Sequence, residues 1–265
     1  MAQGTNKQPA PTGPGRNPAD PLLWPFAAAK FAMDTCFWWV ERASPEPRET
    51  ALAWTTTNTV ALELATMRLR DFSKRRSGQP VLVCAPYALH GALIADFAPG
   101  HSVVGALQSG GLDRIYLTDW RSATPDMRYL SIDSYLSDLN VAIDEIGAPV
   151  DLVGLCQGGW LSLLYAARFP EKVRRLVLVG APVDLYTESA LSRLARNAPE
   201  LVYDQLVARG GGNVSGEEML RFWSRSPSRE DIAVALQRSL SDEGGPELLE
   251  RFARWNEETL NLPGS

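Results

Sequence analysis

Short apolar runs rich in β-branched residues alternate with stretches of helical periodicity through the middle of the sequence. The apolar runs are, in order, VLVCAPY (81–87), RIYLTDW (114–120), VDLVGLC (150–156) and RRLVLVGAPVD (174–184). The helical stretches between them cover about Ser102 to Ser109, Ser131 to Ile146 and Gly158 to Phe169. Strands that alternate with helices form βαβ units, in which a mostly parallel sheet is covered by helices on both faces. The pattern alone therefore predicts an α/β fold.

The segments before and after this region differ from it in composition and in the spacing of apolar residues. Residues 1–21 are rich in Pro, Gly and Ala and contain no apolar segment, which argues against a secretory signal. Apolar residues at near-helical spacing predict one helix from Pro25 or Phe26 to about Arg42 and another from about Thr57 to Phe72. In chain order, the predicted parts are a disordered leader (1–21), a helical N-terminal extension (22–78), the α/β core (79–187) and a helical cap region (188–265).

Charge and cysteine spacing exclude several classes of protein. The chain has 26 Lys and Arg against 31 Asp and Glu, and this net charge of −5 argues against a nucleic-acid partner. No window of about 18 uninterrupted apolar residues is present, so no membrane span is expected. Cys36, Cys84 and Cys156 follow no CxxC spacing, which indicates free thiols in a reducing, cytoplasmic compartment. The sequence contains neither metal-ligand spacing nor a phosphate-binding loop, so we expect no metal and no cofactor.

The third apolar run ends in GLCQGG (154–159) and leads directly into a helical stretch. This is the nucleophile-elbow pattern, with Cys156 at the nucleophile position between two glycines. Gly154 and Gly158 permit the close approach of strand and helix that such a turn requires. The pattern arises by chance about 0.02 times in a chain of this composition. We favour a nucleophile over the alternative, a small buried thiol in a glycine-rich turn. Cys36 and Cys84, in contrast, are expected to pack in the core.

The position of Cys156 at the start of a helix has two expected consequences. The partial positive charge of the helix N-terminus would favour the thiolate form of the sulfur. The backbone N–H of Gln157 would point toward the same place and bind a developing oxyanion.

A second oxyanion donor is expected from the segment APYALHG (85–91), which follows the first apolar run. The backbone N–H of Tyr87 or of Ala88 is our candidate. His90 precedes a glycine in this segment, and we interpret it either as a functional residue or as one that shapes the loop.

Several segments together resemble the polyhydroxyalkanoate (poly-3-hydroxybutyrate) synthases of the α/β-hydrolase superfamily, over about residues 80–265. GLCQGG is similar to the lipase-like box in which these synthases carry a catalytic cysteine, especially the shorter type that works with a second subunit. Further similar segments are DFAPGHSVV (96–104), LTDWR (117–121), APVDL (181–185) and RWNEETLNLPG (254–264). The resemblance implies an α/β-hydrolase-type sheet with flanking helices and a helical cap.

The resemblance also implies covalent acyl transfer. Cys156 would attack the thioester of an (R)-3-hydroxyacyl-CoA, and a chain-end hydroxyl activated by a histidine would then attack the acyl group and lengthen a polyester. The substrate would thus be a hydroxyacyl-CoA or a polyester. The implied partners are a second copy of the chain in a homo-oligomer or a second synthase subunit, and the implied location is the cytoplasm, in association with polyester granules.

One departure from the family pattern concerns the general base. In this fold the triad runs nucleophile, acid, histidine, yet both histidines, His90 and His101, precede Cys156. The family's Asp and His would follow the Asn-Leu-Pro-Gly segment, so we expect the C-terminal strands to be missing from this chain. Asp184 is a candidate acid, with a loop or cap anchor as its alternative role, and it cannot replace the histidine as a base.

Three interpretations of the function stay open. The first is an acyltransferase of the synthase type, catalytic in its longer form. The second is a hydrolase that acts as an intracellular polyester depolymerase, esterase or thioesterase. A cysteine in place of serine favours the acyltransferase over the hydrolase. The third is a non-catalytic homologue that binds granules or a partner subunit through the apolar segment FWWV (37–40), although we favour packing on the hydrolase core as the explanation of this segment.

Overall fold

The computed structural model describes residues 52–184, 186–188, 190–223 and 245–264. The predicted leader, the predicted helix that begins at Pro25 or Phe26, Cys36 and the FWWV segment lie outside the described residues. The boundaries of the leader, extension, core and cap stay predictions.

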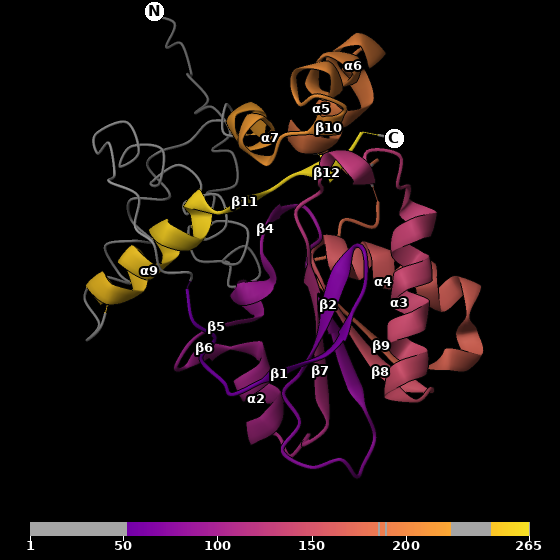
Figure 1. Cartoon of the computed structure of the whole chain (residues 1–265), viewed down its shortest axis with the longest axis vertical. Helices are drawn as coiled ribbons and strands as arrows, with labels where there is room; N and C mark the ends of the chain where they lie inside the picture. Colours follow the sequence, from indigo (N-terminus) through magenta and orange to yellow (C-terminus); the bar gives the residue numbers. More distant parts are fainter. Residues whose placement is uncertain (1–51, 185, 189, 224–244, 265) are drawn as a thin grey trace, which may run out of the picture.

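A six-stranded, mostly parallel sheet forms the centre of the described part (Figure 1). Its strands, in spatial order, are β1 (Thr59–Glu63), β2 (Met67–Asp71), β7 (Ile115–Trp120), β3 (Val81–Cys84), β8 (Val150–Leu155) and β9 (Val173–Val179). Strands β7, β3, β8 and β9 run parallel, whereas β2 is antiparallel to both of its neighbours. Because the parallel strands coincide with the four predicted apolar runs, the predicted α/β fold is confirmed.

The predicted helix from Thr57 to Phe72 is wrong, because this segment forms the antiparallel pair β1 and β2 of the central sheet. Along β2, Met67 and Leu69 are fully buried, whereas Arg68 and Arg70 are only partly buried. Burial that alternates between successive residues is the signature of a strand, not of a helix. The apolar residues of β2 therefore recur with a period of two. The longer interval between Leu64 and Met67 made the segment as a whole resemble a helix.

Three helices connect the parallel strands at the predicted places: α2 (Val103–Ser109), α3 (Ile132–Ile146) and α4 (Gln157–Arg168). Ser102 caps α2 by accepting a hydrogen bond from the N–H of Gly105 at 2.8 Å. Ser131 and Ser134 form a reciprocal capping box at the start of α3. One face of α3 packs on the sheet through Tyr135, Leu136, Leu139, Ala142, Ile143 and Ile146.

Helices dominate the described part of the predicted cap, as expected. They are α5 (Ala190–Asn197), α6 (Glu200–Arg209), α7 (Gly216–Trp223) and α9 (Gly245–Glu257). Short elements complete the list: β4 (Leu89–His90), β5 (Asp96–Ala98), β6 (His101–Ser102), β10 (Asn213–Val214), β11 (Thr259–Leu260), β12 (Leu262–Pro263) and 3-10 turns at Ala92–Ala95, Pro125–Met127 and Pro170–Lys172. None of the helices in the described ranges is long and apolar enough to cross a bilayer.

The end of the cap returns to the core. Strand β11 pairs with β4, directly after the first parallel strand, and β12 pairs with β10. Asn261, between β11 and β12, accepts a hydrogen bond from the N–H of Ala123 at 2.8 Å and so joins the loop after β7. In Figure 1 the yellow C-terminal segment accordingly runs beside β4.

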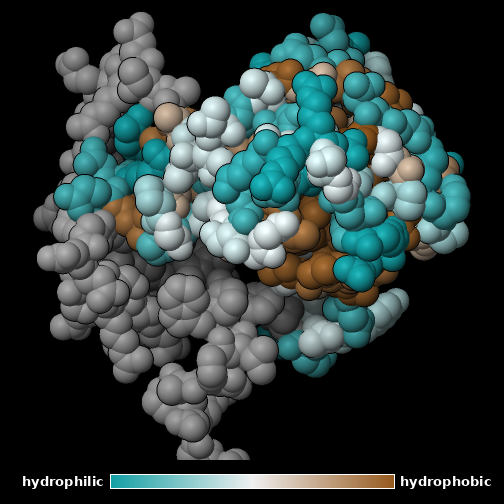
Figure 2. Space-filling model, turned by 90° about the horizontal axis from the view of Figure 1, so that it is seen from below, coloured by the Kyte–Doolittle hydropathy of each residue, from teal (hydrophilic) through white to brown (hydrophobic). Residues whose placement is uncertain are grey.

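Strand β9 lies at one edge of the described sheet and carries exposed apolar side chains. Val177, Leu178 and Val179 are 49%, 38% and 50% exposed. Figure 2 shows an apolar (brown) area on the surface of the described part, surrounded by hydrophilic (teal) residues. Among the described strands, β9 pairs with β8 alone.

Candidate active site

Cys156 occupies a strained turn between β8 and α4. Its φ of 51° and ψ of −118° lie outside the regions that L-residues favour, and such strain persists only where neighbouring contacts impose it. Its N–H donates to the carbonyl of Val179 in β9 at 2.8 Å, and its carbonyl accepts from the N–H of Gly159 at 2.9 Å. The side chain is exposed. The predicted strand–turn–helix geometry is therefore present, with the sulfur at the carboxyl edge of the parallel strands.

Three glycines make this turn possible. A Cβ on Gly154 would lie 2.3 Å from the Cα of Gly159, and one on Gly158 would lie 2.2 Å from the carbonyl oxygen of Cys84. A Cβ on Gly159 would lie 2.6 Å from the Cβ of Ala181. All of these distances are shorter than real contacts allow, so a larger residue would force α4 away from β8 and β3. The glycines of GLCQGG are thus steric requirements of the elbow, as the sequence indicated for Gly154 and Gly158; the structure adds Gly159.

The expectation that the helix N-terminus favours the thiolate of Cys156 is not met. Although the side chain reaches solvent, the surrounding protein desolvates the sulfur and raises the pKa of the thiol. A hydrogen bond with the backbone N–H of Gln157 lowers the pKa of the thiol, but this effect is smaller than that of desolvation. The protonated thiol is therefore the resting form at neutral pH. Cys84 contrasts with it: the side chain is fully buried in β3, and burial raises the pKa of its thiol to about 11.

The candidate oxyanion loop, residues 85–91, begins beside the elbow. Cys84 is the register partner of Gly154, and a Cβ on Gly158 would lie 2.4 Å from the carbonyl oxygen of Ala85. The ring of Tyr87 packs against Tyr135 with 5.5 Å between centroids, and burial raises the pKa of its hydroxyl to about 12. The segment that carries the N–H groups of Tyr87 and Ala88 thus starts next to the turn that presents Cys156.

His90 is buried at the contact between this loop and the cap. Its Nδ1 lies 3.4 Å from the carbonyl oxygen of Glu258, and its ring centroid lies 4.5 Å from that of Trp255. Burial lowers the pKa of the imidazole to about 4, so His90 is neutral at physiological pH. Because a carbonyl accepts from Nδ1, the lone pair resides on Nε2, a buried atom without a hydrogen-bond partner among the described residues. His101 is exposed, and its Nδ1 lies 3.3 Å from the carbonyl oxygen of Pro99.

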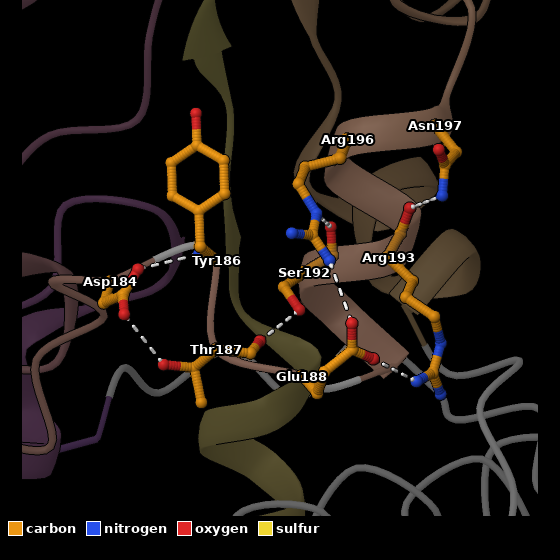
Figure 3. A network of polar contacts seen from close by, with 8 residues as sticks. All are labelled: Asp184, Tyr186, Thr187, Glu188, Ser192, Arg193, Arg196 and Asn197. Atoms are coloured by element: carbon orange, nitrogen blue, oxygen red, sulfur yellow. Dashed lines mark hydrogen bonds and ion pairs between the residues drawn. The ribbon is translucent and has the colours of Figure 1, made fainter.

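Asp184 follows β9 and is exposed. Figure 3 shows both of its carboxylate oxygens bound within the next turn, where one accepts from the N–H of Tyr186 at 2.8 Å and the other from the hydroxyl of Thr187 at 3.1 Å. The same network continues through Ser192 to Glu188, which forms ion pairs with two arginines of α5. These contacts agree with the anchoring interpretation, and the role of Asp184 as catalytic acid stays a prediction.

Two hydrogen bonds of the candidate oxyanion loop were missed by the sequence analysis. The indole N–H of Trp120 donates to the carbonyl of Ala85, and that of Trp255 donates to the carbonyl of Gly91. Buried tryptophans seek a partner for this N–H, but the sequence alone does not identify the partner.

Comparison with known proteins agrees with this geometry. The family model described as alpha/beta hydrolase fold matches residues 111–262, more than half of the chain. This chain belongs to the alpha/beta hydrolase fold family. The hydrolase-type fold predicted from the resemblance is therefore confirmed.

The similarity to polyhydroxyalkanoate synthases is also confirmed. The chain is 36% identical over 159 residues to the poly(3-hydroxyalkanoate) polymerase subunit PhaC of Synechocystis, covering 56% of this chain and 42% of that protein. It is 30% identical over 223 residues to the subunit of the same name from Haloferax mediterranei, covering 79% of this chain and 44% of that protein. The chain thus spans less than half the length of these curated relatives. A shorter match, 46% identical over 54 residues and 20% of each chain, joins it to 2-hydroxy-6-oxo-2,4-heptadienoate hydrolase of Pseudomonas putida.

Proposed function

We propose that this α/β-hydrolase is an acyltransferase of the polyhydroxyalkanoate synthase type, in which Cys156 is the nucleophile that accepts an acyl group from a hydroxyacyl-CoA thioester. The observation that carries the proposal is the strained, glycine-cradled turn that exposes Cys156 at the carboxyl edge of the sheet. The similarity to two polymerase subunits supports the choice of substrate.

The acylation step balances without an external proton acceptor. The sulfur of Cys156 attacks the thioester carbonyl, a new carbon–sulfur bond forms, and the bond to CoA breaks. The proton of the Cys156 thiol leaves with the CoA thiolate, so one thiol is consumed and one is released. The negative charge that develops on the carbonyl oxygen would be stabilised by the N–H of Gln157 and by that of Tyr87 or Ala88.

The synthase and the hydrolase differ in the nucleophile that attacks the acyl-enzyme. In the synthase, a hydroxyl of a growing chain attacks the acyl-enzyme, whereas in a depolymerase, esterase or thioesterase water does so. The match to a hydrolase of Pseudomonas putida favours the hydrolase, but it covers only 54 residues. A thiol nucleophile favours the first, because exchange between two thioesters is nearly balanced in energy. In both candidates the deacylation step needs a base, such as a histidine, that takes the proton of the attacking hydroxyl or water.

The test is an intact-mass and CoA-release experiment on the full chain with 3-hydroxybutyryl-CoA. We expect CoA release and a covalent acyl adduct that maps to Cys156, and we expect Cys156→Ala to lose both. Cys84→Ala is the matched control, because this thiol is fully buried and unable to reach substrate. An adduct on another residue, or CoA release that survives in Cys156→Ala, would contradict the proposal.

The product distinguishes the remaining candidates. Chain elongation indicates the synthase type, and free 3-hydroxybutyrate indicates the hydrolase. Binding of the thioester or of polyester granules without turnover indicates a non-catalytic homologue.

A further inference from the structure

The oxyanion loop (85–91) is held at both ends by indole N–H groups. At its start, Nε1 of Trp120 in β7 donates to the carbonyl of Ala85 at 2.9 Å. At its end, Nε1 of Trp255 in α9 donates to the carbonyl of Gly91 at 3.1 Å. The first anchor belongs to the central sheet, whereas the second belongs to the last helix of the cap.

Between these anchors the loop contains a strained turn. Leu89 has a φ of 71°, a left-handed conformation that a branched side chain rarely adopts. The N–H of His90 donates to the carbonyl of Ala88 at 3.0 Å, which closes a three-residue γ-turn centred on Leu89. Turns of this hand are rare and strained, and they persist only where neighbouring structure imposes them.

The cap supplies that neighbouring structure. Thr259 and Leu260 of β11 pair with β4, whose two residues are the last and the central residue of the turn. The ring of His90 stacks on Trp255 at 4.5 Å, and its Nδ1 approaches the carbonyl of Glu258 at 3.4 Å. These contacts with the strained turn come from one continuous segment, α9 and β11, and helix α7 of the cap also lies beside β4.

We propose that Trp255 is a positioning residue, whose indole N–H holds the oxyanion loop in the conformation that acyl transfer needs. This inference rests on the proposed function for its catalytic consequence. The segment that bears the candidate donors Tyr87 and Ala88 is fixed to the sheet at one end and to the cap at the other. Docking of the cap and assembly of the oxyanion hole are thus one event, and α9 acts on the reaction without touching the substrate.

The test compares Trp255→Phe with Trp54→Phe in the full chain. The first variant keeps an aromatic ring beside His90 and Phe97 and removes the N–H donor to Gly91, together with one ring of the indole. The second makes the same atomic change at a residue that packs on Phe72, outside the oxyanion loop. We expect Trp255→Phe to lower kcat for CoA release about 10-fold with KM unchanged, because a displaced donor weakens transition-state binding. Amide hydrogen exchange in residues 87–91 should rise about 10-fold, while exchange in β8 and α4 stays as in the parent chain.

Two results would overturn the inference. One is a Trp255→Phe variant that matches Trp54→Phe in both kcat and loop exchange. The other is exchange that rises equally in β8 and α4, since the indole would then contribute only to general stability. The exchange measurement needs no turnover, so it still decides the positioning role if the parent chain fails to release CoA. That failure would count against the proposed function alone.

Discussion

At the scale of single residues, the chemistry of Cys156 is set by two opposing effects on one sulfur. The turn exposes the side chain, and the N–H of Gln157 stabilises the thiolate, yet desolvation prevails and raises the pKa of the thiol. The charge at the helix N-terminus was predictable from the position of Cys156 in the motif. The desolvation was not, because it comes from parts of the chain distant in sequence.

This balance predicts how the reactivity of Cys156 depends on pH. Because only the thiolate reacts with iodoacetamide and the pKa of the Cys156 thiol is raised, the alkylation rate should rise about 10-fold from pH 7 to 8 and continue to rise to pH 9. Cys84 should stay unlabelled over this range, since it is fully buried and its pKa is about 11. Peptide mass mapping of timed samples measures each cysteine separately. A Cys156 rate that is flat between pH 6 and 8 would show a lowered pKa and contradict this account.

At the scale of elements, what could be predicted depended on how local the signal was. The four parallel strands are continuous apolar runs, so the sequence of each segment alone indicates burial on both faces of the sheet. The elbow was equally predictable, because its glycines, its strand and its helix are contiguous. Strands β4 and β11 are two residues long, and they pair Thr259 with His90 and Leu260 with Leu89, positions far apart in the sequence. Nothing in either segment alone specifies this pairing.

The pairing of β4 with β11 makes stability depend on pH through His90. Its pKa is about 4 in the folded chain, below the ordinary value of 6.5, because burial disfavours the charged ring. Between these two values the unfolded chain binds a proton that the folded chain does not, so stability falls as the pH falls from about 6.5 to 4. His90 alone should make the chain about 2 kcal/mol less stable at pH 5 than at pH 7.5.

Urea unfolding at the two pH values measures this contribution. His90→Phe keeps an aromatic ring beside Trp255 and removes the titration, so the difference in stability between the two pH values should shrink by about 2 kcal/mol. His101→Phe, at an exposed position, should keep the difference of the parent chain. Equal differences in the parent chain and in His90→Phe would rule out His90 as the source.

At the scale of the whole molecule, β9 has the side chains of an interior strand but lies at an edge of the sheet that the described residues form. Arg174 and Arg175 at its start provide the charge with which edge strands resist further pairing. Its last three residues are apolar, point alternately to the two faces of the sheet and are between 38% and 50% exposed. Strands that are apolar on both faces are typical of the buried middle of a parallel sheet.

We therefore expect the chain to associate through the second half of β9. Replacing Val177 and Val179 together with lysine should raise the concentration needed for half-association at least about 10-fold, because charge on an edge strand opposes pairing. Leu201→Lys, which removes a 63% exposed apolar residue of α6, is the matched control and should associate like the parent chain. Light scattering over a concentration series gives the mass of each variant, and identical curves for all three chains would contradict the expectation.

The direction of this pairing has a consequence for the active site. Two copies joined edge to edge by a two-fold axis must pair their β9 strands antiparallel. The N–H of Cys156 donates to the carbonyl of Val179, at the end of β9, so antiparallel pairing through residues 177–179 brings the partner's strand beside the elbow of each copy. Association through this half of β9 should therefore lower the alkylation rate of Cys156 in concentrated samples. A rate that is equal in dilute and concentrated samples would place the contact away from the second half of β9.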